Sequence, residues 1–337
     1  MRLLLVGNPA REHVGAHLMD GAEELGLEAE IADTRAASAG PLWKQRLFWH
    51  ALGHRPAALG AFNRWLLQKA QAFRPDVLLT TGIAPVTEET LRTLKGRGIV
   101  LVNYQTDDPW NPANSARHFW PALPRYDWIF SPRHAAIADL KAIGCRHVEY
   151  LAFAYNPRLH FLEAPPSEEI ATKYRCDVAI IGGGDRDRYP LAEAIAEAGW
   201  QLRLYGGYWD RKKTLRPFAQ GFVLGHELRW ASYSASVHLC MGRKANREGH
   251  AMRSYELLAM GAVLLVENTE DHRNLFGLEG EAVLYYESTE EMVREAQLLL
   301  RYGEAKRRAM AAQAHARVTG GANTYTDRLR AMIGSAC

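Results

Sequence analysis

Short apolar runs alternate with segments of helical spacing along the first half of the chain. The run Arg2–Gly7 ends in glycine, as a buried parallel strand does, and helical spacing follows over 13–25. The run at 76–82 is another strand, and Thr87 can cap the helix that follows it. Further elements are a strand at 27–33 and strands at 99–105, 128–132 and 147–153, with a helix over 133–144.

The same alternation restarts in the second half. A strand at 176–184 ends in three glycines, and residues 157–166 before it contain a proline and charge cluster that predicts a linker. Repeated strand–helix alternation predicts parallel sheets with helices on both faces, and hence two similar α/β halves joined by a linker. The later elements are a helix at 189–199, strands at 200–207 and 237–242, a helix at 252–260, strands at 262–267 and 282–286, and helices at 288–300 and 324–333.

Composition narrows the class of protein. The 337 residues, 47% hydrophobic and 23% charged, suffice for about two domains of ordinary size. A net charge of +3 is too small to indicate a nucleic-acid partner. The four cysteines form no Cys-x-x-Cys pair, so neither a zinc knuckle nor a disulfide framework is predicted. The first apolar run is too short for a signal peptide, and none reaches the roughly 18 residues of a membrane span. We therefore expect a soluble cytoplasmic protein.

One stretch departs from this average composition. No acidic residue lies between Asp33 and Asp76, and seven basic residues there interleave with aromatic ones. Within it, residues 43–65 carry Trp43 and Trp65 at their ends. A basic and aromatic stretch suits peripheral contact with a membrane or with an anionic or lipid-linked acceptor. The alternative is a helical insertion with a solvated basic face.

The glycines after the strand at 176–184 form the first candidate binding site. Backbone N–H groups in such a turn, here those of Gly183 and Gly184, can approach a phosphate at the start of the next helix. Gly182 and Gly184 match the dinucleotide fingerprint G-x-G-x-x-G, but Asp187 occupies the third glycine position. This mismatch argues against a nicotinamide-dependent oxidoreductase.

Charged residues follow these glycines at once. Asp185 and Asp187 form an Asp-x-Asp pattern, which some sugar transferases use to hold a metal, although loop and cap roles explain it as well. Arg186 and Arg188 are better placed to meet a diphosphate, because guanidinium pairs with phosphate oxygens through two hydrogen bonds. No convincing metal cluster is predicted.

A carboxylate, Glu256, lies within the apolar run 251–265. Burial of an unpaired charge is costly, so Glu256 either faces solvent, pairs with Arg253 one helical turn away, or binds a ligand. In an open α/β sheet the loop before this helix lies at the carboxyl ends of the strands, where ligands bind. There, Glu256 can accept hydrogen bonds from ribose hydroxyls, and Glu248, eight residues earlier, can contact a sugar.

The segment NREGHAMRSYELLAMGAVLLVEN, residues 246–268, resembles the donor-site segment of two-Rossmann-domain (GT-B) glycosyltransferases. It is most similar to the spore-maturation (CgeB-like) branch of the group 1 glycosyltransferases. The resemblance extends to CDVAIIGGGDRDR, LRLYGGYW, YQTDDPWN and EEMVREAQLLL, and so covers most of the chain. It implies an acceptor domain at 1–160, a nucleotide-sugar donor domain at 170–320, a cleft between them, and a C-terminal helix at 321–337 that packs back on the first domain.

The resemblance also implies roles for individual residues. Glu256 would bind the donor ribose, and Arg188, with Arg243 or Lys244, would face the diphosphate. Positive charge there stabilises the leaving nucleoside diphosphate, usually without a metal in this fold. His250 would touch the transferred sugar, the alternative being a loop histidine. The other donor-site candidates are Gly183, Gly184, Glu248 and Arg253.

The acceptor side offers three candidate catalytic residues. An inverting enzyme needs a general base within hydrogen-bond reach of the acceptor hydroxyl, whereas a retaining enzyme does not. The candidates are His13, after the first strand, and Asp107 or Asp108, after a later one, where Asp108 precedes Pro109. A turn role is expected for one of the two aspartates.

The resemblance therefore implies a metal-independent glycosyltransferase that needs no cofactor beyond its nucleotide-sugar. A nucleotide-sugar epimerase on the same fold is one alternative, and a non-catalytic sugar- or nucleotide-binding protein is another. The sequence names neither the donor base and sugar nor the acceptor, whether a glycan, a lipid-linked molecule or a protein.

Overall fold

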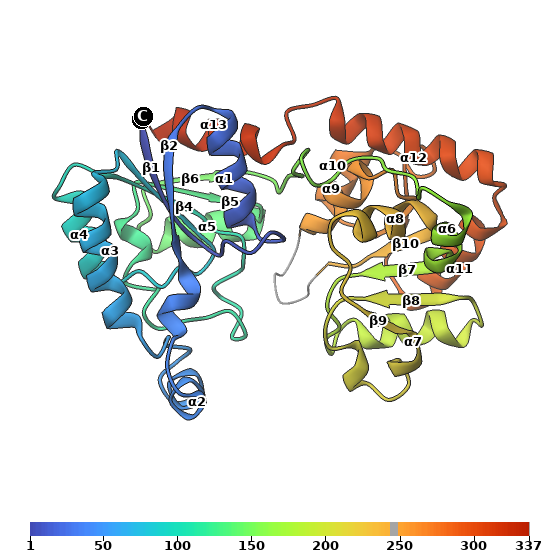
Figure 1. Cartoon of the computed structure of the whole chain (residues 1–337), viewed down its shortest axis with the longest axis horizontal. Coiled ribbons are helices and arrows are strands. Elements are labelled where there is room, and N and C mark those ends of the chain that lie inside the picture. Colours follow the sequence, from blue (N-terminus) through green and yellow to red (C-terminus); the bar gives the residue numbers. More distant parts are fainter. Residues whose placement is uncertain (243–248, 337) are drawn as a thin grey trace. The chain divides into compact units, whose positions relative to one another are not determined.

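The computed structural model describes residues 1–242 and 249–336, which divide into two compact units. The first unit consists of residues 1–152 and 325–336, and the second of residues 153–242 and 249–324. Each unit is built around one parallel sheet of six strands with helices on its faces (Figure 1). The prediction of two Rossmann-like α/β domains is therefore confirmed.

The sheet of the first unit has the strand order β2-β1-β3-β4-β5-β6. Its inner strand β1 buries Leu3, Leu4 and Leu5 completely, which explains why the run there shows no polar alternation. All neighbouring strands are parallel. The strands are β1 (Arg2–Gly7), β2 (Glu28–Asp33), β3 (Val77–Thr81), β4 (Val100–Tyr104), β5 (Trp128–Ser131) and β6 (His147–Tyr150).

Helices cover both faces of this sheet, α3 packing with α4 and α1 with α13 (Figure 1). Gly21 permits the close approach of α1 to α13, because a Cβ there would lie 3.0 Å from the Cα of Thr326. The helices are α1 (Val14–Glu24), α2 (Leu42–Ala51), α3 (Leu59–Phe73), α4 (Glu88–Lys95), α5 (His134–Ala142) and α13 (Tyr325–Ala336), with short 3₁₀ turns η1 (Thr34–Ser38) and η2 (Leu123–Arg125).

The sheet of the second unit has the strand order β12-β11-β10-β7-β8-β9, again parallel throughout. Its strands are β7 (Cys176–Ile181), β8 (Leu202–Tyr205), β9 (Ala219–Gly221), β10 (Ala235–Cys240), β11 (Leu264–Glu267) and β12 (Leu284–Tyr286). The helices are α6 (Glu168–Tyr174), α7 (Tyr189–Glu197), α8 (His226–Ser234), α9 (Met252–Ala259), α10 (Glu270–Phe276), α11 (Thr289–Arg301) and α12 (Glu304–Thr319), with 3₁₀ turns η3 (Trp209–Arg211) and η4 (Arg216–Phe218).

Several elements go beyond those that the sequence patterns indicated. The structure adds α6, α8, α10, α12 and the three-residue strand β9. Residues 157–166, which were expected to be a linker, belong to the second unit. Among the described residues, no helix has the length and apolar character needed to cross a membrane.

Candidate donor site in the second unit

The order of strands in the second unit fixes where a ligand can bind. The chain runs from β7 outward to β8 and β9, and then returns to place β10, β11 and β12 on the other side of β7. This reversal between β7 and β10 is a topological switch point, and open α/β sheets bind ligands outside the carboxyl ends of the two strands at such a point. The candidate site is therefore sought in the loops after β7 and β10.

Arg188 joins these two strand ends. Its Nη1 donates to the carbonyl of Gly183, after β7, at 2.9 Å, and its Nη2 donates to the carbonyl of Met241, after β10, at 3.3 Å. The side chain is largely buried, at 12% exposure, and its Nε lies 3.8 Å from a carboxylate oxygen of Asp185. The sequence thus places a fixed guanidinium at the switch point, where a diphosphate would need positive charge.

The glycine loop after β7 packs closely against the loop after β8. Gly184 donates its N–H to the carbonyl of Gly207 at 2.9 Å. A Cβ on Gly184 would lie 2.8 Å from ring carbons of both Trp209 and Tyr189, whereas a Cβ on Gly183 would make ordinary contacts beyond 3.5 Å. Gly184 is therefore required for packing, and Gly183 is the less constrained glycine of the pair.

The Asp-x-Asp pattern after these glycines forms a turn. Oδ1 of Asp185 accepts hydrogen bonds from the backbone N–H groups of Asp187 and Arg188, each at 3.0 Å. Asp185 thereby shapes the entry into α7, whereas Asp187 and Arg186 are exposed. This arrangement is the loop-and-cap role that the sequence left open for the two acids.

Glu256 lies in α9 and is buried. Its Oε2 forms an ion pair with Nη1 of Arg253, 2.7 Å away and three residues earlier on the same helix. The structure therefore answers the question that a carboxylate in an apolar run raised: Glu256 is paired with Arg253. Burial raises the pKa of the Cys240 thiol at the end of β10, and the charges of Arg188 and Arg253 both oppose that rise, so both cations lie near this strand end.

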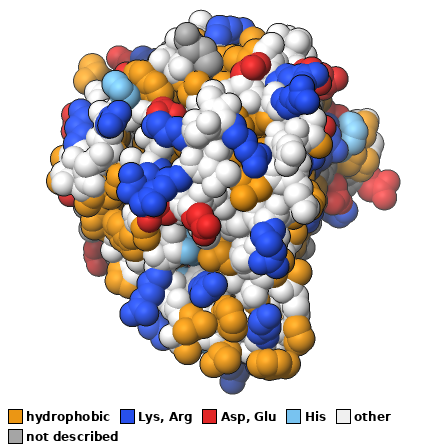
Figure 2. All heavy atoms as spheres, turned by 90° about the vertical axis from the view of Figure 1, so that its left-hand side faces the viewer, with side chains coloured by type: hydrophobic (Ala, Val, Ile, Leu, Met, Phe, Trp, Pro, Cys, Tyr) orange, Lys and Arg blue, Asp and Glu red, His pale blue; other side chains and the backbone are white. Residues whose placement is uncertain are grey.

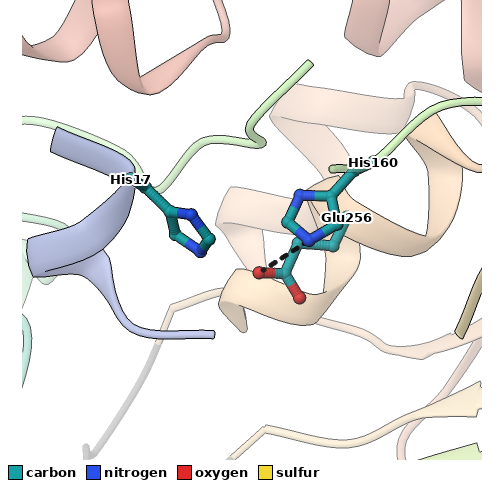
Figure 3. Close-up of side chains that lie close together, drawn as sticks. All are labelled: His17, His160 and Glu256. Carbon is teal, nitrogen blue, oxygen red and sulfur yellow. Dashed lines mark ion pairs between the residues drawn. The ribbon is translucent and has the colours of Figure 1, made fainter. Parts of the chain in front are cut away.

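The segment before α6 supplies a histidine to the same carboxylate. Nε2 of His160 lies 3.8 Å from Oε1 of Glu256 (Figure 3). Nδ1 of His160 accepts the backbone N–H of Asn156 at 3.1 Å, so the ring proton is on Nε2 and faces Glu256. Burial, reinforced by Arg253 and Arg229, lowers the pKa of His160 to about 3. A neutral ring therefore stands beside the carboxylate at neutral pH.

Arg229 of α8 holds this segment in place. Its Nη1 donates to the carbonyl of Leu159 at 3.0 Å, and its Nε pairs with Glu163 at 2.5 Å. The guanidinium also stacks 4.1 Å above the ring of Phe161. Residues 157–166 are therefore a part of the second unit that positions His160.

His250 is buried, and both ring nitrogens face protein groups. Nε2 accepts the backbone N–H of Phe153 at 2.9 Å, so the ring proton lies on Nδ1, which is 3.3 Å from Oδ2 of Asp271. The ring also packs edge-on against Phe153 and Tyr255. His250 is therefore a buried, hydrogen-bonded side chain and not a solvated loop histidine, and protein groups engage both of its ring nitrogens.

A buried polar chain runs beneath α9. The hydroxyl of Ser254 lies 2.9 Å from Nε2 of His272, and Nδ1 of His272 lies 2.7 Å from the carbonyl of Glu267. Because Nδ1 must donate to that carbonyl, Nε2 is the acceptor and Ser254 is its donor. The thiol of Cys240 lies 3.4 Å from the same hydroxyl. This chain fixes α9 on the ends of β10 and β11.

Three donor-site candidates, Arg243, Lys244 and Glu248, lie outside the described residues. The acceptor candidates lie in the first unit. His13 is exposed at the start of α1, and Asp107 is half-buried beside Thr106. Asp108 is buried and accepts the backbone N–H of Trp110 at 3.1 Å, which is the turn role expected for one of the two acids.

Sequence reasoning missed His160, Arg229 and Asp271. His160 reaches α9, and Arg229 reaches the segment 157–166, only when the chain folds. No local spacing in the sequence connects these partners. Asp271 did carry a signal, because Thr269 followed by acidic residues is a helix start, and Thr269 does cap α10.

Comparison with known proteins adds the following. Residues 186–334 match the family model described as Glycosyl transferase-like. No curated protein matches the sequence. Sucrose-phosphate synthase from Thermosynechococcus elongatus is similar in structure, with a TM-score of 0.71 and 12% identity over 99% of this chain and 98% of that one.

Two further solved structures are similar over nearly the whole chain. The Anabaena protein HepE in complex with UDP and glucose has a TM-score of 0.68 and 12% identity, covering 99% of this chain and 98% of that one. A Listeria monocytogenes protein assigned as a UDP-N-acetylglucosamine 2-epimerase has a TM-score of 0.60 and 14% identity, covering 99% and 96%. The chain thus has the GT-B fold of two Rossmann-like domains and carries, over residues 186–334, a domain similar to the glycosyl transferase-like family.

Proposed function

We propose that this chain is a glycosyltransferase of the spore-maturation (CgeB-like) branch, which moves a sugar from a nucleotide-sugar to an acceptor hydroxyl. The observation that carries the proposal is Arg188, whose guanidinium joins the carboxyl ends of β7 and β10 at the switch point. The match to the glycosyl transferase-like family covers this residue. Similar structures include HepE bound to UDP-glucose, which makes uridine the first base to test.

The second unit would bind the donor. Arg188 and the N–H of Gly183 face the diphosphate in this proposal, with Arg243 and Lys244 as further cations. Gly184 shapes the loop, because its own N–H is bonded to the carbonyl of Gly207. Glu256 accepts hydrogen bonds from the ribose hydroxyls, and its ion pair with Arg253 orients the carboxylate. Positive charge at the diphosphate stabilises the leaving group as the glycosidic bond breaks.

Two other donor-site candidates take different roles in this proposal. His250 acts as a positioning residue, since its two ring nitrogens bond Phe153 and Asp271. Glu248 is kept as a sugar contact. Because cations and N–H groups supply the charge stabilisation, we propose that the reaction needs no metal, and its rate should then be unchanged by EDTA.

The first unit would bind the acceptor. Asp107 is the preferred general base, because Asp108 is committed to the turn and Asp107 is more accessible. His13, exposed at the start of α1, is the second candidate. Asp107→Asn should abolish transfer and leave nucleotide binding intact if the enzyme inverts configuration.

Release of nucleoside diphosphate from UDP-, GDP-, ADP- and TDP-sugars tests the proposal. One donor should be consumed, and Arg188→Gln should lower kcat/KM about 100-fold or more, the size of effect seen when one transition-state charge contact is removed. Arg301→Gln, an exposed arginine at the end of α11, is the matched control and should retain full activity. A wild-type protein that binds a nucleotide but turns over no donor would favour a binding protein.

The structural likeness to an epimerase supports one alternative. An epimerase converts a nucleotide-sugar without any acceptor and releases no transferred product. Nuclear magnetic resonance of the donor in the absence of acceptor would detect a change of sugar configuration. A transferase leaves that configuration unchanged or shows only slow hydrolysis.

A further inference from the structure

Helix α2 is unusual because none of its ten residues is buried. Leu42 and Trp43 are 71% and 68% exposed, and Leu47 is 51% exposed. Figure 1 shows α2 at the lower end of the first unit, beyond the sheet and connected through η1 to the end of β2. The exposed apolar side chains of α2 and of the residue that ends it are called the α2 face here: Leu42, Trp43, Leu47, Trp49 and Leu52.

Positive charge borders the α2 face. Figure 2 shows apolar side chains gathered at the lower end of this side of the molecule, with basic side chains around them. Lys44, Arg46, Arg55 and Arg64 are the basic residues of this region, and none of them forms an ion pair within the part of the chain that the structure describes. Lys44 and Arg55 lie 5.5 and 5.9 Å from the ring of Phe48.

A small hollow lies between α2 and the segment that follows it. Its volume is about 210 Å³, and its lining includes Arg46, Trp49, His50 and Arg55. Two guanidinium groups and an imidazole around a space of this size suit a phosphate group. The hollow adjoins the α2 face, since Trp49 belongs to both.

The α2 face is attached to the loop that carries the acceptor candidates. Nδ1 of His54 donates to the carbonyl of Ser115 at 2.6 Å, and Arg117 donates its N–H to the carbonyl of Gly53 at 3.0 Å. Gly53 has φ +64°, and a Cβ there would lie 2.6 Å from Cγ of Arg117. This junction begins only seven residues after Asp108 in the chain.

We propose that the α2 face docks this protein on a bilayer surface that contains anionic phospholipid. Tryptophan and leucine side chains enter the interface between headgroups and acyl chains, where amphipathic rings are favoured. Lys44 and Arg64 lie at the level of the lipid phosphates, and Arg46 with Arg55 holds one headgroup phosphate in the hollow. The charge complementarity selects an anionic bilayer rather than a neutral one. This inference is independent of the proposed donor chemistry.

Co-sedimentation with vesicles tests the inference on the full chain. Wild-type protein should partition at least tenfold more strongly onto vesicles of phosphatidylcholine and phosphatidylglycerol at 7:3 than onto phosphatidylcholine alone. High salt should weaken the binding, because it screens exposed charges. The double variant Lys44→Gln/Arg46→Gln should bind about 30-fold more weakly, since each basic residue near an anionic surface contributes about fivefold.

Apolar variants and matched controls complete the test. Trp43→Ser/Leu47→Ser should bind at least tenfold more weakly than wild type. Leu278→Ser changes a leucine of the second unit that is 71% exposed, and this variant should bind as wild type does. Lys213→Gln/Arg301→Gln, which removes two exposed cations elsewhere, should also leave binding unchanged.

Three results would overturn the inference. The wild-type protein does not sediment with either vesicle, or the α2 variants sediment as wild type does, or the controls lose binding equally. Sedimentation-velocity measurements test whether a second copy of this chain, rather than a bilayer, occupies the α2 face. A wild-type dimer that becomes a monomer in Trp43→Ser/Leu47→Ser, with no vesicle binding, would make the α2 face a contact between two copies instead.

Discussion

Gly184→Ala tests whether packing, rather than ligand approach, requires the last of the three glycines in the donor-site loop. The new Cβ would lie 2.8 Å from carbons of Trp209 and Tyr189, about 1 Å closer than an ordinary contact between carbon atoms. Trp209 cannot easily move away, because it is completely buried and its Nε1 donates to the carbonyl of Gly182 at 2.7 Å. Overpacking of this kind costs about 1–3 kcal/mol in the free energy of unfolding.

Gly183→Ala is the matched control, since its Cβ would lie 3.6 Å or more from its neighbours. Thermal unfolding followed by calorimetry should show a Tm about 3–8 °C lower for Gly184→Ala in the transition of the second unit. Gly183→Ala should change that Tm by about 1 °C or less. Equal Tm values for the two variants would refute the packing argument, as would a larger loss for Gly183→Ala.

Three further predictions concern buried polar groups of the second unit. Burial lowers the pKa of His238 to about 4, so between pH 6.5 and pH 4 the unfolded chain binds a proton that the folded chain does not. The free energy of unfolding should therefore fall as the pH drops through this window, by about 2 kcal/mol at pH 5. Urea midpoints should fall less steeply with pH in His238→Gln than in wild type. Ser254→Ala removes the hydroxyl donor from buried His272 and should cost about 1–3 kcal/mol, and an unchanged urea midpoint would contradict the assigned hydrogen bond. Glu163→Gln leaves buried Arg229 without its carboxylate and should cost about 1–3 kcal/mol, measured as a lower Tm; a Tm equal to that of wild type would show that the pair is unimportant.

The fold was predictable because its inner strands are buried on both faces. The runs at 3–7 and 178–182 have no polar interruptions, and each leads into a helical pattern, which suffices for a parallel α/β sheet. Short or weakly marked elements were missed. Strand β9 has only three residues and lies at the sheet edge, so it carries almost no periodic signal. Helix α12 was also missed, although its many alanine and arginine residues have high helix propensity.

The candidate site was predictable only in part. Gly184, Arg188 and Glu256 follow strands or lie on helices that local patterns identify. Only one of two partners of Glu256 was predictable. Arg253 lies one helical turn away on the same helix, whereas His160 is brought to Glu256 by the fold. Proline and charge in 157–166 indicated a linker because composition cannot show that Arg229, more than 60 residues later, binds this segment.

The most direct test of the donor site is a calorimetric titration of UDP, GDP, ADP and TDP into wild-type protein and into Glu256→Gln and Arg188→Gln. One nucleoside diphosphate should bind the wild-type protein without added metal. Its affinity should fall about tenfold or more in each variant, since each loses a hydrogen bond that involves a charged group. Binding that is equally strong in both variants would contradict the site assigned to the ends of β7 and β10, and the absence of binding by all four would contradict the proposed function.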